Sequence, residues 1–233
     1  MSSFDGDAPC RGIARRAVVG AALGLGSASW SSEARASTRA AWGPEIFGCE
    51  EWGARPPTEP VTVLASPPRL IVVHHTATAN VEDYSLLRAF ALARAIQTHH
   101  MDTNRWIDTG QHFTVSRGAY VTEGRHRSRA ELSRGTMQVR SSHCVGQNDV
   151  AVGIETEGTY SSTEPPAGQY QALVALGAYI CGQYGLDPYD IRGHRDFNTT
   201  ECPGDRLYAL LPRLREDIAT FLRGDPRSAG WTY

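Results

Sequence analysis

The sequence predicts a single α/β domain in which a mixed β-sheet is covered by helices. Segments with the two-residue period of strands alternate along the chain with segments that have helical spacing. Two of the strand segments flank Gly118 in the pattern of a hairpin. The 233 residues, 41% hydrophobic and 21% charged, are typical of one globular core.

The first 36 residues are expected to be an export signal. Arg11, Arg15 and Arg16 precede the apolar stretch AVVGAALGLGSAS, and the segment 34–36 (ARA) has the small-x-small pattern of a cleavage site. The apolar stretch is too short and too rich in glycine for a stable membrane anchor. The paired arginines suggest twin-arginine export, with a loose fit in the residues that follow. We therefore expect a periplasmic or extracellular protein, the alternative being an unstructured N-terminus.

After the signal, residues 37–47 are expected to form a linker, residues 48–224 the folded domain and residues 225–233 a tail. The proline-rich stretch from Cys49 to Pro68 is expected to run as an extended arm across the surface, and its Trp52 is expected to pack rather than react.

A buried strand is expected at Leu70–Val73, a continuous apolar run that follows two prolines. It ends at His74 and His75. The segment 84–101 has helical spacing, and His99 and His100 fall in its last turn, where the helix dipole favours a cation. Packing explains these last two histidines better than chemistry.

The hairpin is expected at 112–117 and 119–125, followed by a basic cluster of Arg125, His126, Arg127 and Arg129. We expect this cluster to be a solvated loop, or a rim that meets an anionic cell wall.

The segment 150–158 is expected to be a strand in which the two-residue period places Gly153, Glu155 and Glu157 on one face. Two glutamates would be costly in a dry core, so this face is expected to open into a cleft. Helices are expected at 169–185 and 206–223, with Asp205 capping the second and Pro212 kinking or splitting it.

The stretch 193–204, GHRDFNTTECPG, places His194 and Cys202 eight positions apart. Imidazole and thiolate suit zinc, but this spacing alone is a weak signal because it fits no common zinc-finger pattern. With His74 at a strand end, the sequence predicts a zinc site of His74, His194 and Cys202 with water on the fourth position, which is the catalytic arrangement.

Four cysteines remain after the signal, which contains Cys10. An oxidising compartment would favour one disulfide and one spare thiol among the three that do not bind metal, with the pairing left open. A disulfide through Cys202 would abolish the zinc site and is the main rival interpretation. The four are Cys49, Cys144, Cys181 and Cys202.

The net charge of −2 gives no reason to expect nucleic acid or an anionic membrane as a partner. All 23 residues counted as lysine or arginine are arginines, which excludes a lysine-based catalytic role. Neither a repeat nor a coiled coil indicates an oligomer, and we expect a monomer.

Four motifs occur in a characteristic order: VVHHTAT, WIDTGQHF, SHCVGQND and GHRDFNTTECPG. Together they resemble the zinc-dependent N-acetylmuramoyl-L-alanine amidases, a family that includes bacteriophage lysozyme-type amidases and peptidoglycan recognition proteins. EWGARPP at 51–57 resembles the recognition-protein branch, and the resemblance runs from about Cys49 to Leu222. It implies a central mixed sheet of about five or six strands, flanked by three helices, with zinc in an open groove that binds peptidoglycan.

The resemblance also implies roles for single residues. His74, His194 and Cys202 match the three zinc ligands, and Thr200 matches a position that steadies the oxyanion of the reaction. The residues expected to border the muramyl-peptide groove are His75, Gln111, His143 and Asn148.

Gln111 stands where many relatives have a tyrosine, and the loss of that tyrosine would suit a domain that binds without catalysis. The anhydro-muropeptide amidases of the same superfamily also lack the tyrosine and use a glutamate that Glu155 matches. We therefore predict an active enzyme with Glu155 as general base. The alternative for Glu155 is an ion pair with Arg192 or Arg195.

The predicted activity is hydrolysis of the amide bond between N-acetylmuramic acid and L-alanine. Zinc would acidify its water and polarise the carbonyl, while a carboxylate moves the proton to the leaving amine. Two alternatives remain, a peptidoglycan-binding module without catalysis and a structural domain stapled through Cys202. The intact His-His-Cys set favours the enzyme, because non-catalytic relatives commonly lose the thiol.

Overall fold

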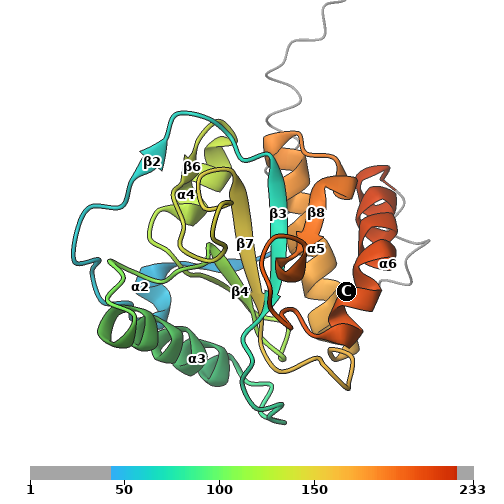
Figure 1. The fold of residues 1–233 in the computed structure, drawn as a ribbon, viewed down its shortest axis with the longest axis horizontal. Helices are drawn as coiled ribbons and strands as arrows, with labels where there is room; N and C mark the ends of the chain where they lie inside the picture. Colours follow the sequence, from blue (N-terminus) through green and yellow to red (C-terminus); the bar gives the residue numbers. More distant parts are fainter. Residues whose placement is uncertain (1–42, 225–233) are drawn as a thin grey trace, which may run out of the picture.

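The computed structural model describes residues 43–224, and Figure 1 shows how they are arranged. The expected export signal, with Cys10, and the expected tail lie outside the described residues. Among the helices that are described, none is long and apolar enough to cross a membrane.

A six-stranded mixed sheet forms the centre of the domain, in the order β1-β5-β4-β7-β3-β8. β3 is parallel to β7 and β8, β4 is parallel to β7, β1 is parallel to β5, and β4 and β5 form an antiparallel hairpin. The strands are β1 (Ile46–Phe47), β3 (Leu70–His75), β4 (Phe113–Val115), β5 (Val121–Glu123), β7 (Ala151–Thr156) and β8 (Ile191–Gly193). β2 (Val63–Leu64) and β6 (Gln138–Val139) pair separately. The mixed α/β sheet and its hairpin are thus confirmed.

Three long helices flank the sheet, as expected: α3 (Leu86–Thr98), α5 (Ala167–Tyr184) and α6 (Asp205–Leu222). The shorter helical elements are α2 (Cys49–Trp52), a turn of π-helix η1 (His99–Thr103), α4 (Ser128–Arg134), η2 (Pro188–Asp190) and η3 (His194–Asp196). In Figure 1, α5 and α6 lie on the opposite side of the sheet from α2 and α3.

The main core lies between the sheet and the helices α5 and α6. Alternate residues of the central strands, such as Ile71 and Val73 in β3 and Ile154 in β7, contact buried leucines and isoleucines of the two helices. Each large apolar side chain buried here stabilises the fold by about 1.5–3 kcal/mol. Because side chains alternate, the intervening residues of the same strands face away from this core, and the functional site lies there.

α2 interrupts the stretch that was expected to be extended throughout. Its Trp52 is 1% exposed, and the indole Nε1 donates to the carbonyl of Glu123 at 2.8 Å. Trp52, Cys49 and Ala93 of α3 form a small second cluster, which fixes α3 against the edge of the sheet. The packing role predicted for Trp52 is confirmed.

Pro212 was predicted to kink or split α6; the helix continues through it, so the split is wrong and the kink stays a prediction. The lost backbone hydrogen bond costs about 3 kcal/mol, which the burial of four apolar side chains along one face outweighs. Those side chains are Leu207, Leu211, Leu214 and Ile218. The capping role predicted for Asp205 is wrong, because Gly204 occupies the N-cap position. Asp205 is the first residue of the helix and pairs with Arg195 at 2.7 Å.

Within the basic cluster after β5, Arg127 and Arg129 are exposed, as expected, but the solvated position predicted for Arg125 is wrong. Arg125 is 3% exposed and donates to the carbonyls of Thr109 and Arg140 and to the hydroxyl of Ser142. It therefore joins two loops that border the functional site. The residues that follow begin the short helix α4, which has too few residues to give a helical period in the sequence.

The two glutamates of the β7 region do not share one cleft. β7 ends at Thr156, and Glu157 lies beyond the regular alternation, fully buried. Its carboxylate accepts from Arg88 Nε at 2.8 Å and from the backbone N–H of Arg117 at 2.9 Å. Only Glu155 keeps the orientation that the two-residue period predicted.

Candidate metal centre

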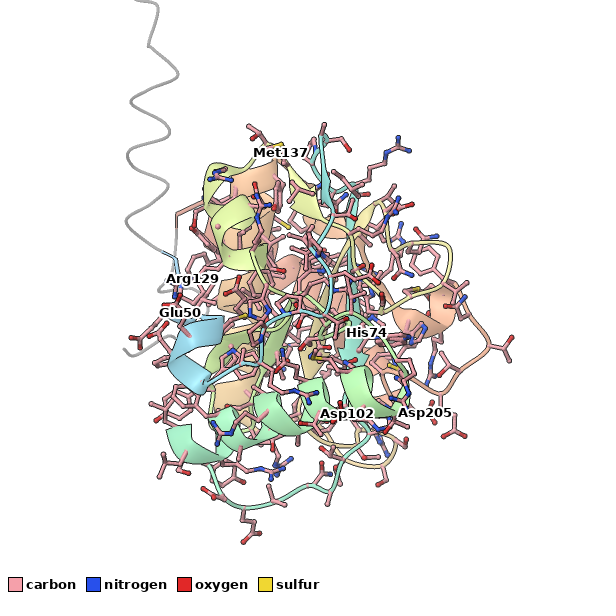
Figure 2. All side chains as sticks on the ribbon, turned by 90° about the vertical axis from the view of Figure 1, so that its left-hand side faces the viewer. Glu50, His74, Asp102, Arg129, Met137 and Asp205 are labelled. Carbon is pink, nitrogen blue, oxygen red and sulfur yellow. The ribbon has the colours of Figure 1, made fainter. Side chains whose placement is uncertain are left out.

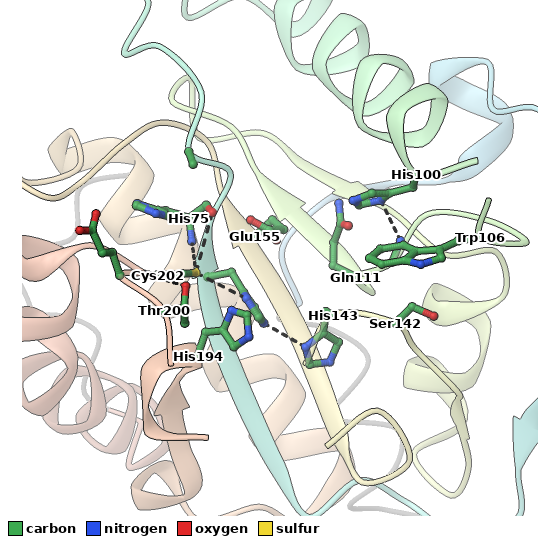
Figure 3. A pocket seen from close by; sticks show the side chains of 14 residues that line it. His75, His100, Trp106, Gln111, Ser142, His143, Glu155, His194, Thr200 and Cys202 are labelled. Atoms are coloured by element: carbon green, nitrogen blue, oxygen red, sulfur yellow. Dashed lines mark hydrogen bonds between the residues drawn. The ribbon is translucent and has the colours of Figure 1, made fainter. Parts of the chain in front are cut away.

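The predicted metal-binding residues meet at the carboxyl ends of three parallel strands (Figure 3). His74 lies near the end of β3 and is paired in register with Glu155 of β7. β8 ends at Gly193, so His194 follows directly at the same edge of the sheet. The loop after η3 then returns, with the N–H of Arg195 donating to the carbonyl of Cys202 at 3.1 Å.

His74, His194 and Cys202 each direct one ligand atom into a common space, and these atoms lie within 4.8 Å of one another. Nδ1 of His74 is 3.6 Å from Sγ of Cys202, and the two imidazole rings are 4.5 Å apart between centroids. His74 is 2% exposed, and in Figure 2 it lies inside the domain. Two imidazoles and one thiolate that leave a position open are the donor set of a catalytic zinc site, so the residues fit the ion.

The protonation of the two histidines suits this role. Burial lowers the pKa of His74, and the neighbouring His143 and His194 lower it further. Burial also lowers the pKa of His194. Both imidazoles are therefore neutral at pH 7 and have a lone pair to offer. Burial and then Glu155 raise the pKa of the Cys202 thiol, an effect that a bound cation reverses.

All four described cysteines are free thiols, so the expected disulfide is wrong, and so is the rival interpretation of Cys202. The four are separated by the fold. Cys49 packs with Trp52, Cys181 lies in the main core, and Cys144 packs with Val72.

Glu155 has no ion-pair partner among residues 43–224. Its Oε2 is buried without a hydrogen bond, and burial raises the pKa of the carboxyl from 4.5 to about 8. Arg195 pairs with Asp205 instead, and Arg192 donates to the carbonyl of Tyr189. The ion-pair alternative for Glu155 is therefore wrong.

A cavity of about 480 Å³ opens over these residues. Glu155, Thr200 and the three metal-binding residues line it, together with three of the four residues expected to border the substrate groove: His75, Gln111 and His143. Asn148 is not among its lining residues. The Oδ1 of Asn148 instead accepts from the backbone N–H groups of His143 and Cys144, each at 2.9 Å.

Two polar side chains that line the cavity each have a donor or acceptor that makes no hydrogen bond within the described part of the chain. The hydroxyl of Thr200 accepts from the N–H of Cys202 at 3.2 Å, so its own proton can point elsewhere. Gln111 is 1% exposed and donates through Nε2 to Thr114 at 2.9 Å, while its Oε1 has no partner.

His100 and Trp106 also line the cavity, with ring centroids 4.6 Å apart, and the sequence did not indicate them. Nδ1 of His100 accepts from the backbone N–H of Gly110 at 3.0 Å. The packing explanation for His100 is therefore incomplete. The helical period could not reveal its position, because η1 has the wider turn of a π-helix.

Two imidazoles, a thiol and an unpaired carboxyl thus lie together at one edge of the sheet. This arrangement places the protein among mixed α/β domains with a candidate catalytic metal site. Residues 64–205 match the family N-acetylmuramoyl-L-alanine amidase (Amidase_2), and the chain belongs to this family.

Relatives in animals carry two kinds of name. The human N-acetylmuramoyl-L-alanine amidase is 31% identical over 72% of the chain, which spans only 28% of that protein's length. Peptidoglycan-recognition protein SC2 of Drosophila simulans is 31% identical over 73% of the chain and 86% of its own length. A variant of Drosophila PGRP-LB, solved in complex with tracheal cytotoxin, superimposes with a TM-score of 0.62 at 28% identity, over 70% of this chain and 90% of that one. The family thus supports a peptidoglycan amidase or a recognition role.

Proposed function

We propose that the protein hydrolyses the amide bond between N-acetylmuramic acid and L-alanine of peptidoglycan, with zinc held by His74, His194 and Cys202. The observation that carries the proposal is the unpaired carboxyl of Glu155 beside that donor set. A domain that only binds ligand has no need to leave a buried carboxyl without a partner, which is costly. Zinc, when bound, supplies a water of lowered pKa and polarises the carbonyl of the substrate.

The chain's own groups would perform the proton transfer. Glu155, in register with His74, would act in its ionised form, which the positive charge of bound zinc favours against the raised pKa of the metal-free carboxyl. It would take the proton of the attacking water and return it to the leaving amine of L-alanine. The Thr200 hydroxyl, whose acceptor side is occupied by the N–H of Cys202, donates to the developing oxyanion. His100 and Trp106 border the space in which the sugar and stem peptide would lie.

A second function, recognition without turnover, is favoured by one observation. Gln111 stands in place of the tyrosine of many relatives, and its amide donates to Thr114 rather than into the cavity. We prefer the enzyme because Glu155 and the complete donor set remain. Export, as predicted from residues 1–36, would bring a monomeric enzyme to the cell wall, outside the cytoplasm.

Digestion of purified peptidoglycan tests the proposal. The purified protein should release new amino termini that are alanine, and a chelator should stop the release until zinc is added. Glu155→Gln should bind zinc and tracheal cytotoxin, the ligand of the PGRP-LB complex, without releasing termini. Binding by the unaltered protein without any release would favour recognition alone.

A further inference from the structure

The two imidazoles of the candidate metal centre each direct their second ring nitrogen at a polar partner. Nε2 of His74 lies 2.9 Å from Nδ1 of His143, and Nε2 of His194 lies 3.1 Å from Oδ1 of Asn198. A ligating histidine commonly donates its other N–H to an acceptor, which fixes the tautomer and the ring orientation. We propose that His143 and Asn198 are positioning residues that hold His74 and His194 with Nδ1 free for a metal ion. This inference rests on the metal site of the proposed function and not on its reaction.

The hydrogen-bond partners of His74 and His143 fit one assignment of their protons, in which His74 donates to His143. A neutral imidazole carries a single N–H. If Nδ1 of His74, the atom facing Cys202, binds metal, its proton is on Nε2 and Nδ1 of His143 accepts it. The proton of His143 is then on Nε2, which faces the carbonyl oxygen of Ala151 at 3.5 Å, an atom that can only accept.

The ring of His143 is held in this orientation by the residues around it. Asn148 accepts from the backbone N–H of His143 and of the next residue. Gly153 of β7 leaves room for the ring, since a Cβ there would lie 2.4 Å from Cδ2 of His143. The N–H of Gly153 donates in turn to Nδ1 of the buried His112 at 3.0 Å. Asn148 thus has a role that requires no contact with substrate.

Asn198 is anchored to the same loop. Its Nδ2 donates to the carbonyl of Val145 at 3.3 Å, and the thiol of Cys144 donates to its Oδ1 at 3.4 Å. Because a carbonyl only accepts, this contact assigns the amide nitrogen to the Val145 side and leaves Oδ1 for His194. The segment 143–148 therefore contributes to the orientation of both metal-binding imidazoles.

Zinc affinity, measured without substrate by competition with a fluorescent chelator, tests the proposal. His143→Asn keeps an acceptor near the place of Nδ1, whereas His143→Leu has a similar shape and no acceptor. At position 198, Asn198→Asp keeps the acceptor for His194 and Asn198→Leu removes it. We expect about 10–100-fold weaker zinc binding for the leucine variants and a change of less than about threefold for the conservative ones. Gly153→Ala, which removes no polar group, should also weaken binding, because it displaces the ring of His143.

Two further measurements separate positioning from general loss of structure. The visible spectrum of bound Co²⁺ reports ligand geometry, and its bands should shift in the leucine variants while the melting temperature of the metal-free protein stays near that of the wild type. The exposed His99 gives a matched control, since His99→Asn and His99→Leu should both bind zinc as the wild type does. If one leucine variant fails to fold, the pair at the other position decides.

Wild-type zinc affinity in both leucine variants would overturn the proposal. Lost turnover in His143→Leu at unchanged zinc affinity would also overturn it and would assign His143 to the substrate. If the expected zinc affinities are found but the wild type releases no alanine termini, the proposed reaction fails and this inference stands.

Discussion

Replacing Glu155 by glutamine should abolish turnover and at the same time stabilise the metal-free protein. The carboxyl has a buried, unpartnered Oε2, and burial raises its pKa from 4.5 to about 8. The folded state therefore holds the proton more tightly than the unfolded state does. The stability that this proton contributes is fully present below pH 4.5 and is lost as the pH rises towards 8.

The two pKa values set the size of the effect. At pH 7 the unfolded carboxyl is ionised and the folded one is mostly protonated, which costs the wild type at most about 3 kcal/mol of unfolding free energy. At pH 5 the same calculation gives about 1 kcal/mol. Glutamine has nearly the same shape as glutamate and does not ionise, so the unfolding free energy of Glu155→Gln does not fall in this way as the pH rises.

Urea unfolding of the metal-free wild type and of Glu155→Gln at pH 5 and pH 7 measures the difference. The variant should gain stability over the wild type as the pH rises, while Glu201→Gln, at an exposed position of the cavity rim, should show no such gain. An unchanged difference between the two pH values would refute the argument from burial. Near-normal release of alanine termini by Glu155→Gln would refute its role as general base.

Three other substitutions have defined outcomes. Cys202→Ser should reduce both zinc content, measured by elemental analysis, and turnover to background; retention of either would contradict the donor set. Asp108→Asn weakens the part-buried contact with His126, whose pKa Asp108 raises, so unfolding free energy should fall by about 1.5–2 kcal/mol at pH 6 and by less once the pH exceeds the raised value. Equal losses in urea unfolding at pH 6 and pH 9 would argue against that ion pair. Trp52→Ala should cost about 3–5 kcal/mol in the same assay, and a loss below 1 kcal/mol would contradict its packing role.

The strand ends that position the site could be predicted because their signals are local. The apolar run before His74 and the two-residue period around Glu155 each fix which face a side chain occupies. That His74 and Glu155 are neighbours could not be read from either segment, because the register of parallel strands far apart in sequence is set by the whole sheet.

Other features depend on contacts that no local pattern encodes. Arg125 looks like a surface cation in sequence, yet it is buried among carbonyl groups from two distant loops. The sequence placed Asn148 in a loop near the groove, but it could not show that the amide oxygen of Asn148 accepts from the backbone of that loop. The disulfide prediction followed from the expected compartment, and the placement of the cysteines in separate clusters overrides it.

The central claim is that His74, His194 and Cys202 together hold zinc with one position open for water. Zinc X-ray absorption spectroscopy of the metal-loaded protein tests it most directly. We expect a single sulfur neighbour at about 2.3 Å with nitrogen and oxygen neighbours at about 2.0–2.1 Å, and loss of the sulfur shell in Cys202→Ser. Zinc bound without sulfur, or a sulfur shell that persists in Cys202→Ser, would contradict it.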